Sequence, residues 1–166
     1  IREYFEAARL ISDQRKDVRF VVAGKIDLGN PNSLTQYEYD EMRKHNFIKF
    51  MGHVSDTEEL FKKSNIVVLP SYREGFPKVL MEAASYSKPS ITTDVPGCNE
   101  AVKHNITGLV IPSKNIQALV DAIVHLIDNT EIRKEMGRKA FDRAKEMFDE
   151  DKIINQQLLI YDELLS

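Results

Sequence analysis

Short apolar runs alternate with helical periodicity along the chain. Runs of β-branched and aliphatic residues predict buried strands, and apolar residues three and four positions apart predict amphipathic helices. The predicted strands are 18–23, 48–51, 66–70, 90–93 and 109–111. The predicted helices are 1–16, 37–45, 55–63, 77–87 and 98–103, and three more close the chain near 116–127, 132–144 and 150–165. Strands that are apolar on both faces and separated by helices favour a parallel sheet covered by helices on both sides.

Two local signals refine this pattern. Ser55 and Glu58 have the spacing of a capping box, which predicts the start of the third helix. Pro77 suits the first position of the fourth helix, where its missing N–H costs nothing. Sheets of this kind bind ligands at the carboxyl ends of their strands, so the search for a site narrows to five loops. These loops follow Ala23, Met51, Leu69, Thr93 and Ile111.

Composition limits the class of protein. The chain has 166 residues, of which 42% are hydrophobic and 30% charged, and this balance fits one soluble domain. No apolar run approaches the ~20 residues of a membrane span. A single cysteine, Cys98, excludes an internal disulfide and a multi-thiolate zinc site, and we expect it to pack in the core. The net charge of -3 argues against non-specific nucleic-acid binding.

The loop after Leu69 carries the most chemistry. Gly75 allows the backbone to approach a ligand closely, and the N–H groups of residues 78–80 are expected to point out of a helix N-terminus, which suits phosphate. Glu74 and Glu82 flank this helix start, and carboxylates accept hydrogen bonds from the hydroxyls of polyols. A diphosphate between two sugars matches that order of groups. The alternative is that both glutamates are ordinary solvated charges, since two glutamates at this spacing also occur by chance.

The wider string around this loop resembles a known family. Residues 71–82 read SYREGFPKVLME and are followed by Ala83-Ala84-Ser85 and Lys88-Pro89. Residues 93–102 and 105–112 continue the likeness as TDVPGCNEAV and NITGLVIP. Together these segments resemble the retaining glycosyltransferases of family 4, and most of all the branch that builds bacterial capsule and exopolysaccharide repeat units on lipid carriers. The resemblance covers essentially the whole chain.

The resemblance implies roles for particular residues. Glu74, the first glutamate of the motif, is expected to contact hydroxyls of the donor sugar and is the candidate catalytic residue. Glu82, the second, is expected to bind the ribose diol of the nucleotide. The other implied donor-sugar and nucleotide contacts are Gly75, Phe76, Lys78 and Val79 beside the sugar and diphosphate, Val54 beside the base, and Gly24 near the diphosphate.

The resemblance also implies a domain organisation. Residues 1–166 are expected to form the nucleotide-sugar-binding C-terminal domain of a two-domain GT-B enzyme, with a Rossmann-like three-layer α/β fold and a parallel sheet. We expect the N-terminal acceptor domain, the first strand and the Arg and Lys that clamp the diphosphate to lie ahead of Ile1. On that basis the fragment alone is expected to be inactive. Pro77 stands where many relatives have Gly, which removes one backbone donor to the sugar.

The function that follows from the resemblance is a hexosyltransferase activity. We expect transfer of a hexose or N-acetylhexosamine from a nucleotide sugar, with UDP favoured, to a lipid-linked glycan, with retention of configuration and without a metal or other cofactor. The expected location is cytoplasmic, and peripheral association of the whole enzyme with the inner face of the membrane is left open. Two alternatives remain: a non-catalytic nucleotide-sugar binding module, and a GT-B-type sugar-nucleotide epimerase.

Overall fold

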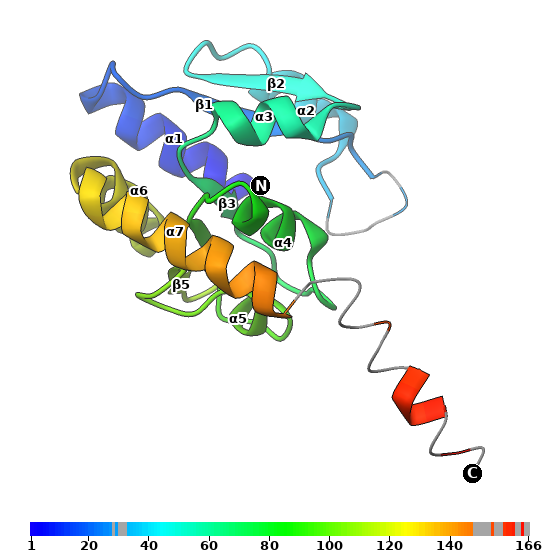
Figure 1. The fold of residues 1–166 in the computed structure, drawn as a ribbon. Coiled ribbons are helices and arrows are strands. Elements are labelled where there is room, and N and C mark those ends of the chain that lie inside the picture. Colours follow the sequence, from blue (N-terminus) through cyan, green and yellow to red (C-terminus); the bar gives the residue numbers. More distant parts are fainter. Residues whose placement is uncertain (28, 30–32, 148–153, 155–157, 162–163, 165–166) are drawn as a thin grey trace.

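Helices and strands alternate along the chain in the computed structural model, which describes residues 1–27, 29, 33–147, 154, 158–161 and 164 (Figure 1). The strands are β1 (Phe20–Ala23), β2 (Ile48–Gly52), β3 (Val67–Leu69), β4 (Ser90–Thr93) and β5 (Gly108–Ile111). The helices are α1 (Arg2–Gln14), α2 (Gln36–Met42), α3 (Thr57–Lys63), α4 (Lys78–Ser85), α5 (Cys98–Ala101), α6 (Ile116–Asp128) and α7 (Thr130–Met147). The predicted strands and the predicted helices up to residue 147 are all present.

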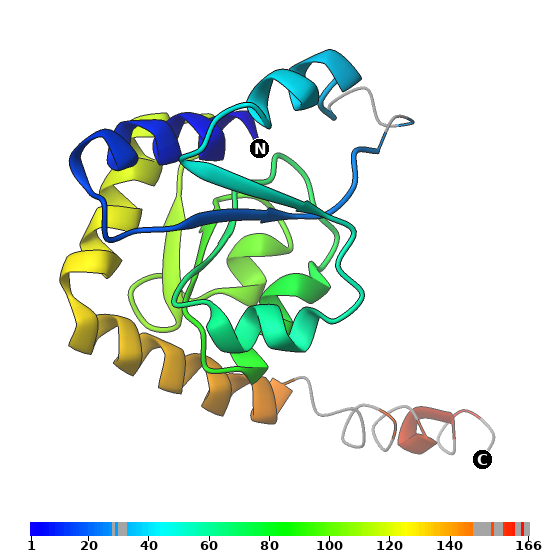
Figure 2. The ribbon, with the colours of Figure 1, turned by 90° about the horizontal axis from the view of Figure 1, so that it is seen from above.

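All of the strand pairs are parallel, as the apolar patterns predicted. β1 pairs with β2, with Phe20 opposite Ile48, and β4 pairs with both β3 and β5. The strands hydrogen-bond as two sheets, one of two strands and one of three, rather than as one continuous ladder. Figure 2 shows the strands between two layers of helices, with α1 and α2 on one side and α3, α4 and α7 on the other. This arrangement is the three-layer α/β fold expected from the sequence.

Two apolar clusters hold the layers together. The larger cluster joins the buried face of α1 to that of α6, with Phe5, Ile11, Leu119 and Ile123 as members, and extends to Ile91 in β4. The smaller cluster lies between α4 and α5 and consists of Leu80, Val95, Cys98, Ala101 and Val102. Because Val95 belongs to the loop after β4 and Leu69 at the end of β3 packs against the cluster, the cluster links the ends of these two strands to α4.

The helix starts differ from the predictions in detail. The predicted capping box at Ser55 and Glu58 was wrong: α3 begins one residue later, and the carboxylate of Asp56 accepts from the N–H of Glu59 at 3.2 Å. Asp caps a helix as well as Ser does, so neighbouring candidates compete. Pro77 is likewise the N-cap of α4 rather than its first residue. The closing helix predicted near 150–165 falls mostly outside the described residues.

A capping box does form at α2, and it is tied to the start of α1. The Thr35 hydroxyl accepts from the N–H of Glu38 at 3.2 Å, and the Glu38 carboxylate accepts from the N–H of Thr35 at 2.8 Å. The Arg2 guanidinium donates to both Glu38 oxygens, at 2.8 and 2.9 Å, and to the Ser33 carbonyl at 3.1 Å. These bonds hold Ser33 and the first turn of α2 against the start of α1.

The ion pair predicts how the protein responds to acid. The Arg2 guanidinium, together with the donors of Thr35, lowers the pKa of Glu38 from 4.5 to about 2. A lowered pKa means that the stabilisation is present above pH 4.5 and is lost as the pH falls through about 2. Glu38→Gln should therefore lose less stability than the unaltered chain over that range, as measured by urea unfolding at several pH values. Glu146→Gln, an exposed position on α7, is the control, and equal acid sensitivity of the Glu38 variant and the unaltered chain would contradict the assignment.

Candidate functional site

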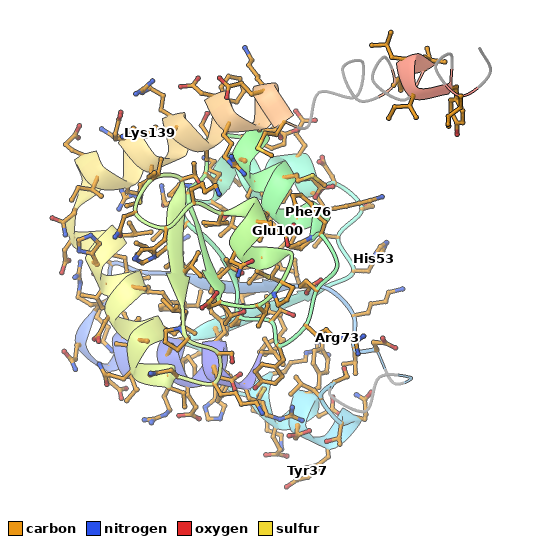
Figure 3. The ribbon with its side chains drawn as sticks, turned by 90° about the horizontal axis from the view of Figure 1, so that it is seen from below. Tyr37, His53, Arg73, Phe76, Glu100 and Lys139 are labelled. Carbon is orange, nitrogen blue, oxygen red and sulfur yellow. The ribbon has the colours of Figure 1, made fainter. Side chains whose placement is uncertain are left out.

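The loops that follow the strands gather on one side of the molecule. Figure 3 shows His53 and Arg73, from the loops after β2 and β3, on this side, together with Phe76. The loops after β1 and β2 are joined by a hydrogen bond from the N–H of Gly24 to the Gly52 carbonyl, at 2.7 Å. Both glycines have positive φ, +132° and +66°, which other residues rarely adopt. Val54, two residues further on, is half-buried.

The loop after β3 is anchored by two threonines of the neighbouring strand. The Thr92 hydroxyl donates to the Leu69 carbonyl at 2.9 Å, and the Thr93 hydroxyl donates to the Ser71 carbonyl. Both threonines are buried, so each hydroxyl satisfies a carbonyl near the end of the β3 ladder. The register of β4 against β3 therefore determines where the loop to Glu74 begins.

Tyr72 fixes the same loop to two other parts of the chain. Its hydroxyl donates to the Glu3 carboxylate in the first turn of α1. The Lys114 amine lies 5.2 Å from the centre of its ring, in the range of a cation–π contact. Lys114 itself, in the connection between β5 and α6, has a φ of +58°. Tyr72 thus joins α1, the loop of Glu74 and the loop before α6.

Gly97, at the start of α5, packs directly on the backbone of the Glu74 loop. A Cβ at this position would lie 1.8 Å from the Gly75 carbonyl oxygen, and the φ of Gly97 is +79°. Cys98, the next residue, is fully buried, which confirms that it packs in the core. Burial raises the pKa of its thiol, and the negative charge of Glu74 raises it further. Hydrogen bonds with the side chains of Thr92 and Thr93 lower the same pKa and so reduce the increase. Glu74 itself is half-buried.

The N-terminus of α4 presents free backbone donors between the two glutamates. The N–H of Leu80 donates to the Pro77 carbonyl at 3.0 Å, so the expectation that it would be free is wrong. No hydrogen bond within the described part of the chain uses the N–H of Lys78 or Val79. No acidic residue stands in the first turn of α4, so the positive end of the helix dipole is not neutralised within the helix.

The other predicted residues lie around this helix start. Glu82 is exposed on α4, four residues after Lys78, which is just over one helical turn. Phe76 is 39% exposed at the end of the loop, and Gly75 has no atom within 4 Å of the place where a Cβ would stand. Glu74, Gly75, Phe76, Lys78 and Val79 are thus contiguous on the surface of one loop and helix. Gly24 and Val54 come from the two neighbouring loops.

Sequence reasoning missed a hollow of about 680 Å³ beside this loop. It lies at the carboxyl ends of β4 and β5, and Asp94, Asn99, Lys103, His104 and Ser113 supply its polar lining. None of the residues predicted from the sequence lines it. The loops after Thr93 and Ile111, two of the five loops at the carboxyl ends of the predicted strands, contribute to it. Their position at that edge of the sheet was the signal in the sequence that could have indicated the hollow.

The described residues show neither a metal-binding cluster nor a membrane-spanning helix. No group of three or more His, Cys, Asp or Glu side chains in those residues is placed to hold a metal ion. No helix within the same residues has the length and apolar character needed to cross a membrane.

The fold and the loop arrangement define a class of protein. The structure superposes with a TM-score of 0.83 on a solved structure of Anabaena Alr3699/HepE in complex with UDP-glucose, at 22% identity, covering 98% of this chain and 44% of that one. A glycosyltransferase from Rickettsia africae superposes with a TM-score of 0.85, at 23% identity, covering 99% and 44%. The fold is therefore that of the C-terminal half of a GT-B glycosyltransferase. Residues 1–143 match the family described as glycosyl transferases group 1, and the chain belongs to that family.

Two curated relatives are bacterial glycosyltransferases. It is 30% identical to the N,N'-diacetylbacillosaminyl-diphospho-undecaprenol alpha-1,3-N-acetylgalactosaminyltransferase of Campylobacter jejuni, over 99% of this chain and 42% of that protein. It is 26% identical to the capsular polysaccharide biosynthesis glycosyltransferase CapM of Staphylococcus aureus, over 99% of this chain and 43% of that protein. The chain thus spans less than half the length of these relatives.

The contact between Gly97 and Gly75 yields a matched pair of variants. Gly97→Ala forces a Cβ against a backbone carbonyl and strains a positive φ, so we expect a loss of about 1–3 kcal/mol of stability or more. Gly75→Ala adds a methyl group in open space, so we expect a change within about 0.5 kcal/mol. Urea unfolding measures both, and amide chemical shifts of residues 74–76 should move further in the Gly97 variant. Equal stabilities of the two variants would show that the contact does not hold the loop.

Proposed function

We propose that the chain is the nucleotide-sugar-binding domain of a glycosyltransferase that transfers a hexose or N-acetylhexosamine to a lipid-linked glycan. The observation that carries the proposal is the start of α4, where the N–H groups of Lys78 and Val79 have no hydrogen-bond partner among the described residues and stand between Glu74 and Glu82 in the sequence. Backbone donors at the positive end of a helix bind phosphate. A carboxylate on each side suits a ligand whose diphosphate separates two polyols.

In this proposal each part of the donor has its own contact. The diphosphate lies against the start of α4, where Lys78 adds a positive charge. The hydroxyls of the donor sugar face Glu74, and the ribose diol faces Glu82. Since Gly75 carries no side chain and the position is open, the sugar can approach the backbone of the loop.

The base is proposed to lie by the loops that follow β1 and β2. Gly24 and Gly52 are held together by a backbone hydrogen bond, and their lack of side chains leaves room beside the diphosphate. Val54, half-buried, offers an apolar surface for the base. The base we propose is uracil, because the structure of Alr3699/HepE is described with UDP and with UDP-glucose.

The transfer itself is proposed to proceed with retention and without a metal ion. As the bond to the donor sugar breaks, negative charge grows on the departing diphosphate. Free N–H groups at a helix start and a lysine stabilise such charge without reorganisation, which is the electrostatic form of catalysis. Glu74 touches the reacting sugar in this arrangement and is the proposed catalytic residue. The chain alone is proposed to bind the donor without transferring the sugar.

The acceptor and location follow from the relatives. The Campylobacter jejuni relative is named for a carbohydrate on diphospho-undecaprenol, and the Staphylococcus aureus relative for capsular polysaccharide biosynthesis. We therefore propose that the acceptor is a lipid-linked glycan, which this domain binds together with a further domain of the whole protein. The proposed place of the reaction is the cytoplasmic face of the membrane.

The division of roles between the two glutamates is testable by calorimetry with UDP and UDP-glucose. Glu82→Ala should lower the affinity for both ligands by about fivefold to tenfold, because both contain the ribose. Glu74→Ala should leave UDP affinity unchanged and weaken only UDP-glucose. Glu146→Ala, exposed on α7, is the control and should change neither affinity. Equal losses for both ligands in both glutamate variants would contradict the proposed roles.

A further inference from the structure

The hollow at the carboxyl ends of β4 and β5 has the size of a small-molecule site. Its volume of about 680 Å³ falls within the ~300–1,000 Å³ of typical ligand pockets. Its floor is apolar and includes Val102 and Ile111, both buried. Its polar groups come from the loop after β4, from α5 and the turn that follows it, and from the loop after β5.

Two internal hydrogen bonds hold the polar side chains of the hollow in place. The Asn99 amide donates to one Asp94 oxygen at 2.9 Å, which leaves the second Asp94 oxygen and the Asn99 carbonyl as acceptors. The N–H of Val110 donates to Nδ1 of His104 at 3.0 Å. In the neutral imidazole the proton is then on Nε2, so His104 offers a donor.

The backbone around the hollow is also held in place. The N–H of Lys103 donates to the buried Thr107 hydroxyl at 2.9 Å, and the N–H of Asp94 donates to the Ile111 carbonyl at 2.8 Å. The Arg143 guanidinium of α7 donates to the Glu100 carbonyl of α5 at 2.9 Å. A site whose walls are ordered before binding avoids part of the entropy cost of ordering them when a ligand arrives.

The chemistry of the lining favours a neutral polyol. Asp94 and Asn99 supply acceptors, while Lys103 and His104 supply donors, and a sugar hydroxyl both donates and accepts. The apolar floor suits the C–H face of a sugar ring. Asp94 and Lys103 carry opposite charges that balance each other, so the lining lacks the excess of positive charge that a phosphate requires.

We propose that this hollow binds a neutral saccharide, namely a sugar unit of the glycan acceptor. Gly97 lies in the chain between Asp94 and Asn99, which line the hollow, and it packs against the Gly75 carbonyl of the Glu74 loop, so the two sites are neighbours. A sugar in the hollow therefore lies beside the sugar that Glu74 contacts. The saccharide site is inferred from the hollow itself, whereas its assignment to the acceptor rests on the proposed function.

The test is an NMR titration of the isotope-labelled chain with N-acetylgalactosamine, glucose and, separately, UDP. We expect at least one of the two sugars to shift the amides of Asn99, Lys103 and Val110 and the ring of His104 at millimolar concentration. UDP should shift residues 78–82, and saturating UDP should leave the sugar response in place. Inorganic phosphate serves as the charged probe, and a response of the hollow to phosphate but to neither sugar would overturn the proposal.

Variants make the test specific to the hollow. Lys103→Met and Asn99→Ala should each weaken sugar binding by about fivefold to tenfold and leave UDP binding unchanged. Lys134→Met, at an exposed position on α7, is the matched control. Sugar binding that neither variant weakens, or no sugar response while UDP binds, overturns the saccharide site and leaves the proposed function standing. Sugar binding without any response to UDP contradicts the proposed function and leaves only the saccharide site.

Discussion

The close contact between Gly97 and Gly75 is the constraint on which the site depends. The Gly75 carbonyl occupies the space that a Cβ of residue 97 would need, at 1.8 Å, so the loops after β3 and β4 pack backbone against backbone. A side chain at position 97 would separate them. Because they touch, the loop that carries Glu74 is fixed against the segment that leads from β4 into α5 and lines the hollow. Beneath them, the cluster of Leu80, Cys98 and Val102 fills the space between α4 and α5.

The threonines of β4 provide the second requirement of this arrangement. All four residues of β4 are buried, so a hydroxyl there needs a partner. Thr92 and Thr93 donate to the carbonyls of Leu69, the last residue of β3, and of Ser71, two residues beyond it. Strand pairing thus extends into the loop through side chains. The Glu74 loop is therefore positioned by the neighbouring strand β4. The hydrogen bond from Tyr72 to Glu3 also attaches this loop to α1.

The parts of the fold that depend on local pattern could be predicted from the sequence, and those that depend on competition or distance could not. β4 was predicted at its observed bounds because three consecutive β-branched residues, Ile91 to Thr93, between turn-forming segments are a local signal. The cap of α3 was misplaced because Ser55 and Asp56 are both good caps and only geometry decides between them. The bond from Arg2 to Glu38 could not be predicted, since the two residues are 36 positions apart. The capping box of Thr35 and Glu38 is a local signal three positions long that was overlooked.

The site shows the same division between local and distant signals. The glutamates and the start of α4 lie within one short string, so the sequence identified them. The hollow went unnoticed because its lining comes from separate segments of the chain. Each polar residue of that lining is exposed, and taken singly it cannot be distinguished from an ordinary surface residue. The division of the strands into two sheets could not be predicted either, because pairing between distant strands leaves no trace in the apolar pattern of each strand.

The charge distribution explains how an acidic chain can present a site for a diphosphate. The net charge is -3, yet many of the acidic side chains pair with a Lys or Arg one helical turn away, as Glu58 with Lys62, Glu59 with Lys63 and Asp142 with Arg138. Charges paired at such short range largely cancel beyond a Debye length of about 8 Å at physiological salt. The field at the start of α4 is then set by nearby groups, which are the helix dipole, Lys78 and the two glutamates. Net charge therefore indicates little about this site, because a phosphate responds to the few groups within that distance.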